Sequence, residues 1–384
     1  MRRLSPAAFC LAMIAAVVCY CTPPARAAAE HLHISDRTVE RQERLISDPA
    51  WSPRAHLGKT SGGAVFCGLA NPDGSIKLWQ LGQEIEQDRK INVTATRLTG
   101  LSRNGQDLWV ATRDGLYRVA GEATEPLKQV LHLFVSTIGP PGNSPPTYHT
   151  SDDTECIGVA VASEMPWVAL GPLGVETYIP AAGADDADEA EWHSPFLLHI
   201  GRSDTVITAD PVTGVWLFAP PRQREPDEVW GLVHLDVQET GEQPEIAVLP
   251  DTPPQDTIPD LHRPSIAVAE STGVLVAGEM AQGNVFLRLK DGVAHTSVIP
   301  PDVIGARHVT AMTVDAAGRV YCGTDGAGVI VFEGDTWSVH PVTAYLPAFY
   351  DTGLKPVDDI LISDDGVLYV ASQRIVIRWW PDGQ

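Results

Sequence analysis

The chain has 384 residues, of which 44% are hydrophobic and 20% charged, with 33 glycines and 31 prolines. These fractions are typical of a globular protein and exclude a disordered tail, a collagen-like fibre and a disulfide-stapled miniprotein. The 49 acidic residues outnumber the 27 basic residues and give a formal net charge of −22. We therefore expect neither nucleic acid nor an anionic lipid surface among its partners.

Residues 1–27 are organised like a secretory signal peptide. Arg2 and Arg3 form a basic start, residues 9–18 are apolar, and Ala25-Arg26-Ala27 has small residues where a signal peptidase cleaves. The apolar stretch is shorter than the about 20 residues that a membrane-spanning helix needs. We therefore expect no membrane insertion and a periplasmic or secreted protein whose mature chain starts near residue 28.

The cysteines do not predict a disulfide framework. Cleavage after residue 27 removes three basic residues and no acid, so the net charge changes from −22 to −25. Only Cys67, Cys156 and Cys322 then remain, an odd number that allows one disulfide at most. Cys67 and Cys322 have equivalent places in two repeats, so we expect them to be buried apart from each other. A lipid anchor at Cys19 or Cys21 is the alternative to a soluble product.

The clearest unit in the sequence spans residues 309–340. Four runs rich in Val, Thr and aromatic residues, at 309–315, 320–324, 329–333 and 337–340, are separated by short turns containing Gly or Asp. Runs of this length and composition between such turns are typical of strands joined by tight hairpins. The segment therefore predicts a four-stranded antiparallel sheet.

The second run of this unit recurs seven times along the chain. Each copy has a large anchor residue followed by small residues, as in Leu108-Trp-Val-Ala-Thr112, and the spacings between anchors are 43 to 59 residues. The anchors are Phe66, Trp109, Trp167, Trp216, Leu275, Tyr321 and Tyr369. A period of this length with four strands per unit predicts a seven-bladed β-propeller over residues 56–384. Six blades are one alternative, because the unit around Phe66 is the weakest match. A β-sandwich with many strands is the other.

The end of the chain suggests how the ring closes. Residues 358–362, 367–371 and 375–380 form three strands and no fourth, and an exposed sheet edge needs to be covered. We expect the N-terminal segment 28–55 to supply the missing outer strand from residues 31–35. The longer spacings predict inserts at 137–155, 181–197 and 220–262.

Two of the units carry a more specific pattern. The run Asp315-Ala-Ala-Gly-Arg-Val-Tyr-Cys-Gly-Thr324, followed by Gly334-Asp-Thr-Trp337, is similar to the propeller repeat of two-component regulators, and residues 108–119 match it well. The resemblance covers most of residues 56–384 as architecture. It implies a ligand- or partner-sensing domain outside the cytoplasm. No segment resembles a kinase or regulator domain, so we expect a binding role and not direct signal transmission.

A propeller places one set of loops around the mouth of its central axis. The loops that enter first strands and leave second strands share this face. They contribute the candidate ligand-binding residues Arg113, Asp114, His149, His262, Glu279, His308, Asp325 and Arg374, with His199 a less certain member. Imidazole, carboxylate and guanidinium groups together can bind a polar ligand or a divalent metal. Solvated loops and hairpin turns are the simpler explanation of the same residues.

These observations favour a non-catalytic binding protein. The sequence contains no Gly-x-Ser-x-Gly, no His-Glu-x-x-His and no phosphate-binding glycine loop. We expect no cofactor, and a small molecule, a peptide or another exported protein as the partner. The alternative is a lyase or hydrolase that uses His262 and His308 with a divalent metal. The ligand and the oligomeric state are left open.

Overall fold

The computed structural model describes residues 29–33, 55–59, 65–70, 76–81, 85–91, 98–104, 107–112, 115–119, 128–129, 156–162, 165–170, 174–179, 191–193, 205–220, 231–239, 244–254, 257–349, 352–372 and 375–380. Within them the chain is mostly β-strand and forms four-stranded antiparallel sheets, as predicted. Helical structure there is limited to short segments such as α3 (Pro301–Ile304) and the 3-10 helix η5 (Pro341–Tyr345). No helix in the described part has the length and apolar character to cross a membrane.

The strands follow one another in sets of four. The first three sheets are β2–β5 (His56–Lys59, Val65–Ala70, Ile76–Leu81, Ile85–Ile91), β6–β9 (Leu98–Asn104, Asp107–Thr112, Gly115–Val119, Lys128–Gln129) and β10–β13 (Cys156–Ala162, Met165–Leu170, Gly174–Ile179, Glu191–His193). The next three are β14–β17 (Val206–Ala209, Val215–Ala219, Gly231–Glu239, Pro244–Val248), β18–β21 (His262–Ala269, Gly273–Met280, Gly283–Lys290, Val293–Val298) and β22–β25 (Val309–Val314, Val320–Thr324, Val329–Glu333, Thr336–Val339).

The last sheet combines the two ends of the chain. It contains β26 (Asp359–Ile362), β27 (Leu368–Ser372) and β28 (Ile375–Trp379), and its fourth strand is β1 (Ala29–His33). β1 runs antiparallel to β28, with Ala29 opposite Trp379 and His33 opposite Ile375. An N-terminal strand therefore covers the edge of the final sheet, two residues earlier in the chain than the predicted run 31–35.

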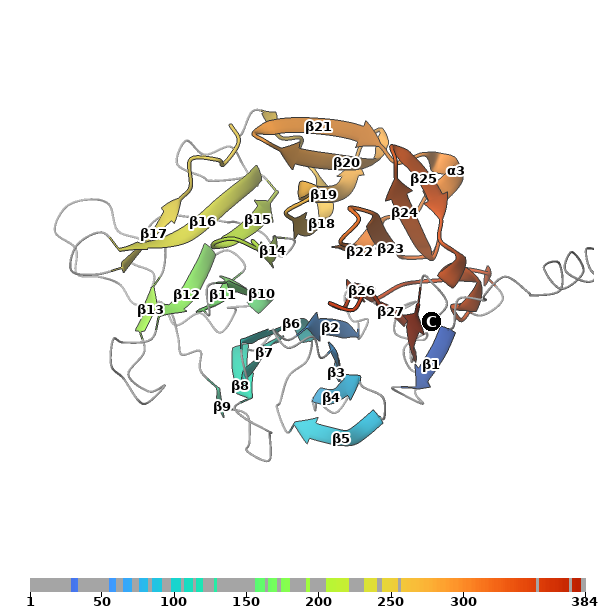
Figure 1. Ribbon diagram of the computed structural model, residues 1–384, viewed down its shortest axis with the longest axis horizontal. Helices are drawn as coiled ribbons and strands as arrows, with labels where there is room; N and C mark the ends of the chain where they lie inside the picture. The colour runs from blue at the N-terminus through green and yellow to red at the C-terminus, as the bar shows by residue number, and fades with distance from the viewer. Residues whose placement is uncertain are drawn as a thin grey trace, which may run out of the picture.

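The sheets are arranged around a common centre (Figure 1). The first strand of each sheet, β2, β6, β10, β14, β18, β22 or β26, lies nearest the middle of the view, and the fourth strand lies outermost. Each first strand contacts the first strand of the following sheet, and β26 contacts β2. All strand pairs within a sheet are antiparallel.

The predicted anchors lie on the second strands and fill the spaces between sheets. Trp167 is fully buried and packs with Val215 and Leu217 of the next sheet. Tyr369 in the last sheet packs with Leu57 and Val65 of the first. Four other anchors are also almost fully buried: Trp109, Trp216, Leu275 and Tyr321. Phe66 is half-buried. Because large side chains of one sheet are buried against the next, each sheet depends on its neighbour for its apolar core.

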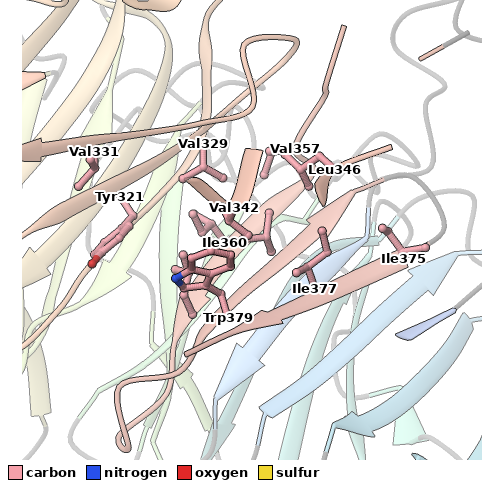
Figure 2. Close-up of a cluster of buried hydrophobic side chains, with 12 residues drawn as sticks. Tyr321, Val329, Val331, Val342, Leu346, Val357, Ile360, Ile375, Ile377 and Trp379 are labelled. Atoms are coloured by element: carbon pink, nitrogen blue, oxygen red, sulfur yellow. The ribbon is translucent and has the colours of Figure 1, made fainter. Parts of the chain in front are cut away.

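Figure 2 shows one of these interfaces, between β22–β25 and the last sheet. Tyr321 and Val331 come from the first of these sheets, and Ile360, Ile377 and Trp379 from the second. The small residues next to the anchors allow this close approach. A Cβ atom on Gly323 would lie 2.5 Å from Val357 Cγ1, so a larger residue there would force the interface apart.

Two predictions can be compared directly with these strands. The unit 309–340 contains β22–β25 as expected. The prediction of an insert at 220–262 was wrong in part, because β16 and β17 lie within it. The Pro and acidic residues of this interval are typical of a loop, but Leu232, Val233 and Leu235 within it are buried core residues of β16. The inserts predicted at 137–155 and 181–197 lie largely outside the described residues, as does the signal peptide 1–27.

Cys67, Cys156 and Cys322, the cysteines among the described residues, are buried and form no disulfide with one another. Burial raises the pKa of the Cys67 thiol, with a further contribution from the charges of Asp359 and Asp358. Burial also raises the pKa of the Cys322 thiol. Both thiols therefore remain protonated and act as small apolar side chains, as predicted from their places in the repeats.

Candidate functional site

The structure describes four of the candidate mouth residues. His262 begins β18, Glu279 lies near the end of β19, His308 precedes β22 and Asp325 follows β23. Glu279 lies opposite His262 in the register of β18 and β19. The other candidates, Arg113, Asp114, His149, His199 and Arg374, lie outside the described residues and stay predictions.

Three of these four residues meet at one imidazole. The His308 Nδ1 atom lies 3.1 Å from Asp325 Oδ2 and 3.6 Å from Glu279 Oε1. The His308 side chain is 16% exposed, against 35% for Glu279 and 28% for Asp325. The ring is thus mostly covered while both carboxylates remain accessible to solvent. Glu279 comes from the sheet β18–β21 and Asp325 from β22–β25, so the contact joins two neighbouring sheets.

Asp325 also fixes the backbone on which His308 is carried. The His308 N–H donates to Asp325 Oδ1 over 2.9 Å, and the Asp325 N–H donates to the His308 carbonyl over 3.1 Å. One carboxylate oxygen therefore holds the loop before β22, while the other faces the imidazole. The backbone of His308 therefore has little freedom, because its N–H and its C=O are both hydrogen-bonded to Asp325.

Arg263 is a member of the group that the sequence analysis missed. Its Nη1 atom lies 3.3 Å from His308 Nδ1 and 3.7 Å from Glu279 Oε1, and its side chain is 63% exposed. The residue has a positive φ of 48°, which non-glycine residues rarely adopt. It lies in a register shift between His262 and Ser265, where strand β18 departs from regular pairing with β19. The sequence His262-Arg263-Pro264 contains a signal for such an irregularity, because proline cannot donate a ladder hydrogen bond.

We call Arg263, Glu279, His308 and Asp325 the mouth cluster. Two carboxylates and one guanidinium converge on a single imidazole nitrogen, so donors and acceptors for a polar ligand lie within a few ångströms of each other. An imidazole nitrogen can donate or accept a hydrogen bond, so the His308 ring can serve a ligand in either role. Among the described residues, no group of three or more His, Cys, Asp or Glu side chains has the arrangement needed to hold a metal ion.

No protein-family model matches the sequence, and no curated protein matches it. Solved structures do match. The extracellular domain of BT4673 from B. thetaiotaomicron, described as a one-component or two-component system, has TM-scores of 0.54 and 0.51 in two structures at 11% and 12% identity. A streptogramin B lyase structure has a TM-score of 0.56 at 12% identity, with 94% of this chain and 99% of that chain covered.

These neighbours show the kind of fold and no more. They are propeller-like structures, which agrees with the four-stranded antiparallel sheets described above. The two BT4673 matches cover 91% and 85% of this chain but only 39% and 38% of that one, so this chain spans about two fifths of its length. The predicted resemblance to the repeat of two-component regulators thus has a counterpart in the fold of an extracellular domain described as part of such a system. Membership of that repeat family stays a prediction.

Proposed function

We propose that this protein is an exported, seven-bladed β-propeller that binds a polar small molecule or a peptide at the mouth of its central axis. Binding, without chemical conversion, is the function that the mouth cluster supports best. The observation that carries the proposal is the convergence of Arg263, Glu279 and Asp325 on His308 at the loop ends of neighbouring sheets.

The proposed closed ring draws on three observations. The contacts between first strands run through all the sheets and return from β26 to β2. Tyr369 and Val367 of the last sheet share an apolar cluster with Leu57 and Val65 of the first. β1 pairs with β28 and brings the N-terminal segment into the last sheet. A ring of this kind leaves no sheet without an apolar neighbour on each face, which is the condition for burying the second-strand anchors.

The proposed location outside the cytoplasm draws on the sequence and on the neighbours. Residues 1–27 have the basic, apolar and small-residue regions of a signal peptide. The BT4673 structures are of an extracellular domain. An exported sensor-like or scaffold role for this chain fits both. A high negative charge also keeps such a protein soluble and disfavours anionic partners.

A ligand screen with a site variant tests the proposal. Sugars, polar amino acids and short polar peptides are screened by thermal shift, and compounds that stabilise the protein are measured by titration calorimetry. We expect these compounds to lose at least about tenfold in affinity in His308→Asn, because a hydrogen bond to a charged partner contributes about 1.5–3 kcal/mol. His295→Asn is the control, since His295 is exposed on the outermost strand β21. Binding that is equal in both variants, or a screen in which no compound stabilises the protein, would refute a binding site at the mouth.

The same preparation tests the catalytic alternative. The wild-type protein is incubated with lactones and glycosides, with and without added Mg²⁺, and products are followed by mass spectrometry. Turnover that disappears in His308→Asn and persists in His295→Asn would replace the binding proposal with a lyase or hydrolase. His308 lies between two carboxylates, an arrangement that acid–base catalysis can use.

A further inference from the structure

A pocket lies between the sheets β18–β21 and β22–β25, at the end of the strands opposite the mouth cluster. It has a volume of about 210 Å³ and is bordered by the turns at 271–272, 317–318 and 334–335. The first two of these turns join first to second strands, whereas the mouth loops lie at the other ends of the same strands. The pocket is therefore separate from the mouth cluster.

The inner wall of the pocket is apolar and comes from both sheets. Leu275 and Phe286 belong to β19 and β20, and Val320 and Phe332 to β23 and β24. The Phe286 and Phe332 rings lie 5.2 Å apart with a tilt of 50°. Leu275, Phe286 and Val320 are almost fully buried. Gly318, with φ of +82°, keeps the pocket open from the turn side, because a Cβ there would lie 3.3 Å from Thr272 Cγ2.

One cation lines this pocket. The Arg288 Nε atom donates to the Thr272 carbonyl over 3.2 Å, which leaves its two Nη groups for other partners. Asp335 is the carboxylate of the lining, and within the described part of the chain no ion pair joins it or any other acid to Arg288. Lys290, whose Nζ donates to the Ser271 carbonyl, adds a second positive charge at the rim. In a protein with a net charge of −22, a half-buried guanidinium without a carboxylate partner favours an anion.

We propose that this pocket binds a small carboxylic acid with an aromatic or branched aliphatic body. The body lies against the part-exposed Phe332 ring, and the carboxylate accepts hydrogen bonds from the Nη groups of Arg288. Pockets for drug-sized ligands have volumes of about 300–1,000 Å³, so this one suits a molecule with one ring or a short branched chain. The proposal is independent of ligand binding at the mouth, since the two sites share no residue.

Titration calorimetry with three matched probes tests the charge and the apolar body together. The probes are 3-phenylpropionate, its uncharged analogue 3-phenylpropanamide, and acetate, which has no apolar body. We expect the acid to bind in the millimolar range or tighter, and the amide and acetate each about tenfold more weakly, as the loss of a charge-assisted bond or of a buried ring requires. 3-Phenylpropylamine, a cation of the same size, should not bind.

Two neighbouring alanines provide a matched pair of variants. Ala317 is exposed and lines the pocket, whereas Ala316 is exposed on the same turn and does not. Ala317→Trp should fill the entrance and abolish binding of 3-phenylpropionate, while Ala316→Trp should bind it like the wild type. Arg288→Gln, which keeps a donor for the Thr272 carbonyl, should bind acid and amide equally. Absence of binding to the wild type, equal binding of acid and amide, preference for the amine, or binding that survives Ala317→Trp would each overturn the proposal.

Discussion

His340 makes the stability of this protein depend on pH in a defined window. The residue is 8% exposed and lies between the last two sheets, with its ring edge-on to Tyr321 and Trp379 at centroid distances of 5.4 and 5.5 Å. Its Nδ1 atom accepts a hydrogen bond from the Val342 N–H at the start of η5. A proton on Nδ1 would face that donor, so the folded state holds the ring neutral.

Burial, with the nearby charge of Arg319, lowers the pKa of His340 from 6.5 to about 4. The unfolded chain takes up this proton near its ordinary pKa, whereas the folded chain does so only near pH 4. Between these values the unfolded state binds more protons, so stability falls as the pH is lowered through the window. The full effect is about 3 kcal/mol, of which about 2 kcal/mol is lost between about pH 7.5 and 5.

His340→Asn removes the titration and keeps an acceptor for the Val342 N–H, because asparagine is a good N-cap residue. Loss of the ring contacts lowers stability at every pH, so the informative quantity is the change of unfolding free energy between about pH 7.5 and 5, measured by urea unfolding. We expect this change to be about 2 kcal/mol smaller in the variant than in the wild type. His295→Asn, on exposed β21, should behave like the wild type. An identical pH dependence in wild type and His340→Asn would refute the assignment of the protonation cost to this ring.

Three further changes test the packing of the sheets. Gly323→Ala should lower stability by about 1–3 kcal/mol in urea unfolding, and adding Val357→Ala should recover part of the loss because it removes the Cγ1 atom that lies 2.5 Å from the new Cβ. Deleting residues 28–33, which include β1, should lower the melting temperature by several degrees by exposing the edge of β28, and an unchanged melting curve would contradict the closing role of β1. Asp251→Ala should cost about 1–3 kcal/mol, since Asp251 binds Nδ1 of the buried His234 at 2.9 Å; the exposed Asp260→Ala should cost little.

Local chemistry explains why the strand pattern could be predicted. In the unit 309–340, the turn after β22 is formed by Asp315, whose carboxylate accepts the N–H groups of Ala317 and Arg319 at 3.0 and 2.8 Å. All of these groups lie within five residues, so the Asp-x-x-Gly pattern contains the whole interaction. The buried anchors could be predicted for a similar reason, because a large residue followed by small ones on a strand has the same packing role in every copy.

The residues of the candidate site could be predicted only in part. Glu279, His308 and Asp325 were found because they occupy fixed places at strand ends. Arg263 was missed because its position depends on the register shift in β18 and on a positive φ, neither of which follows from an alternating pattern. The lining of the pocket is spread from Ser271 to Asp335 over two sheets, and the sequence does not show which strand faces meet. His340 was missed for the same reason: its burial depends on Trp379 in the following sheet.

The mouth cluster and the pocket should be separable by experiment, although the same two sheets carry both. Thr272 at the pocket and Glu279 in the mouth cluster are seven residues apart along β19, which begins just after Thr272 and contains Glu279 near its end. At about 3.3 Å per residue the two ends lie roughly 23 Å apart, well beyond the about 10 Å within which substitutions usually couple. His308→Asn should therefore leave the affinity for 3-phenylpropionate unchanged, and Ala317→Trp should leave the affinity for any ligand of the mouth unchanged. Loss of both activities in either single variant, with folding retained, would mean that the sheets move relative to each other on binding and that the two sites are coupled.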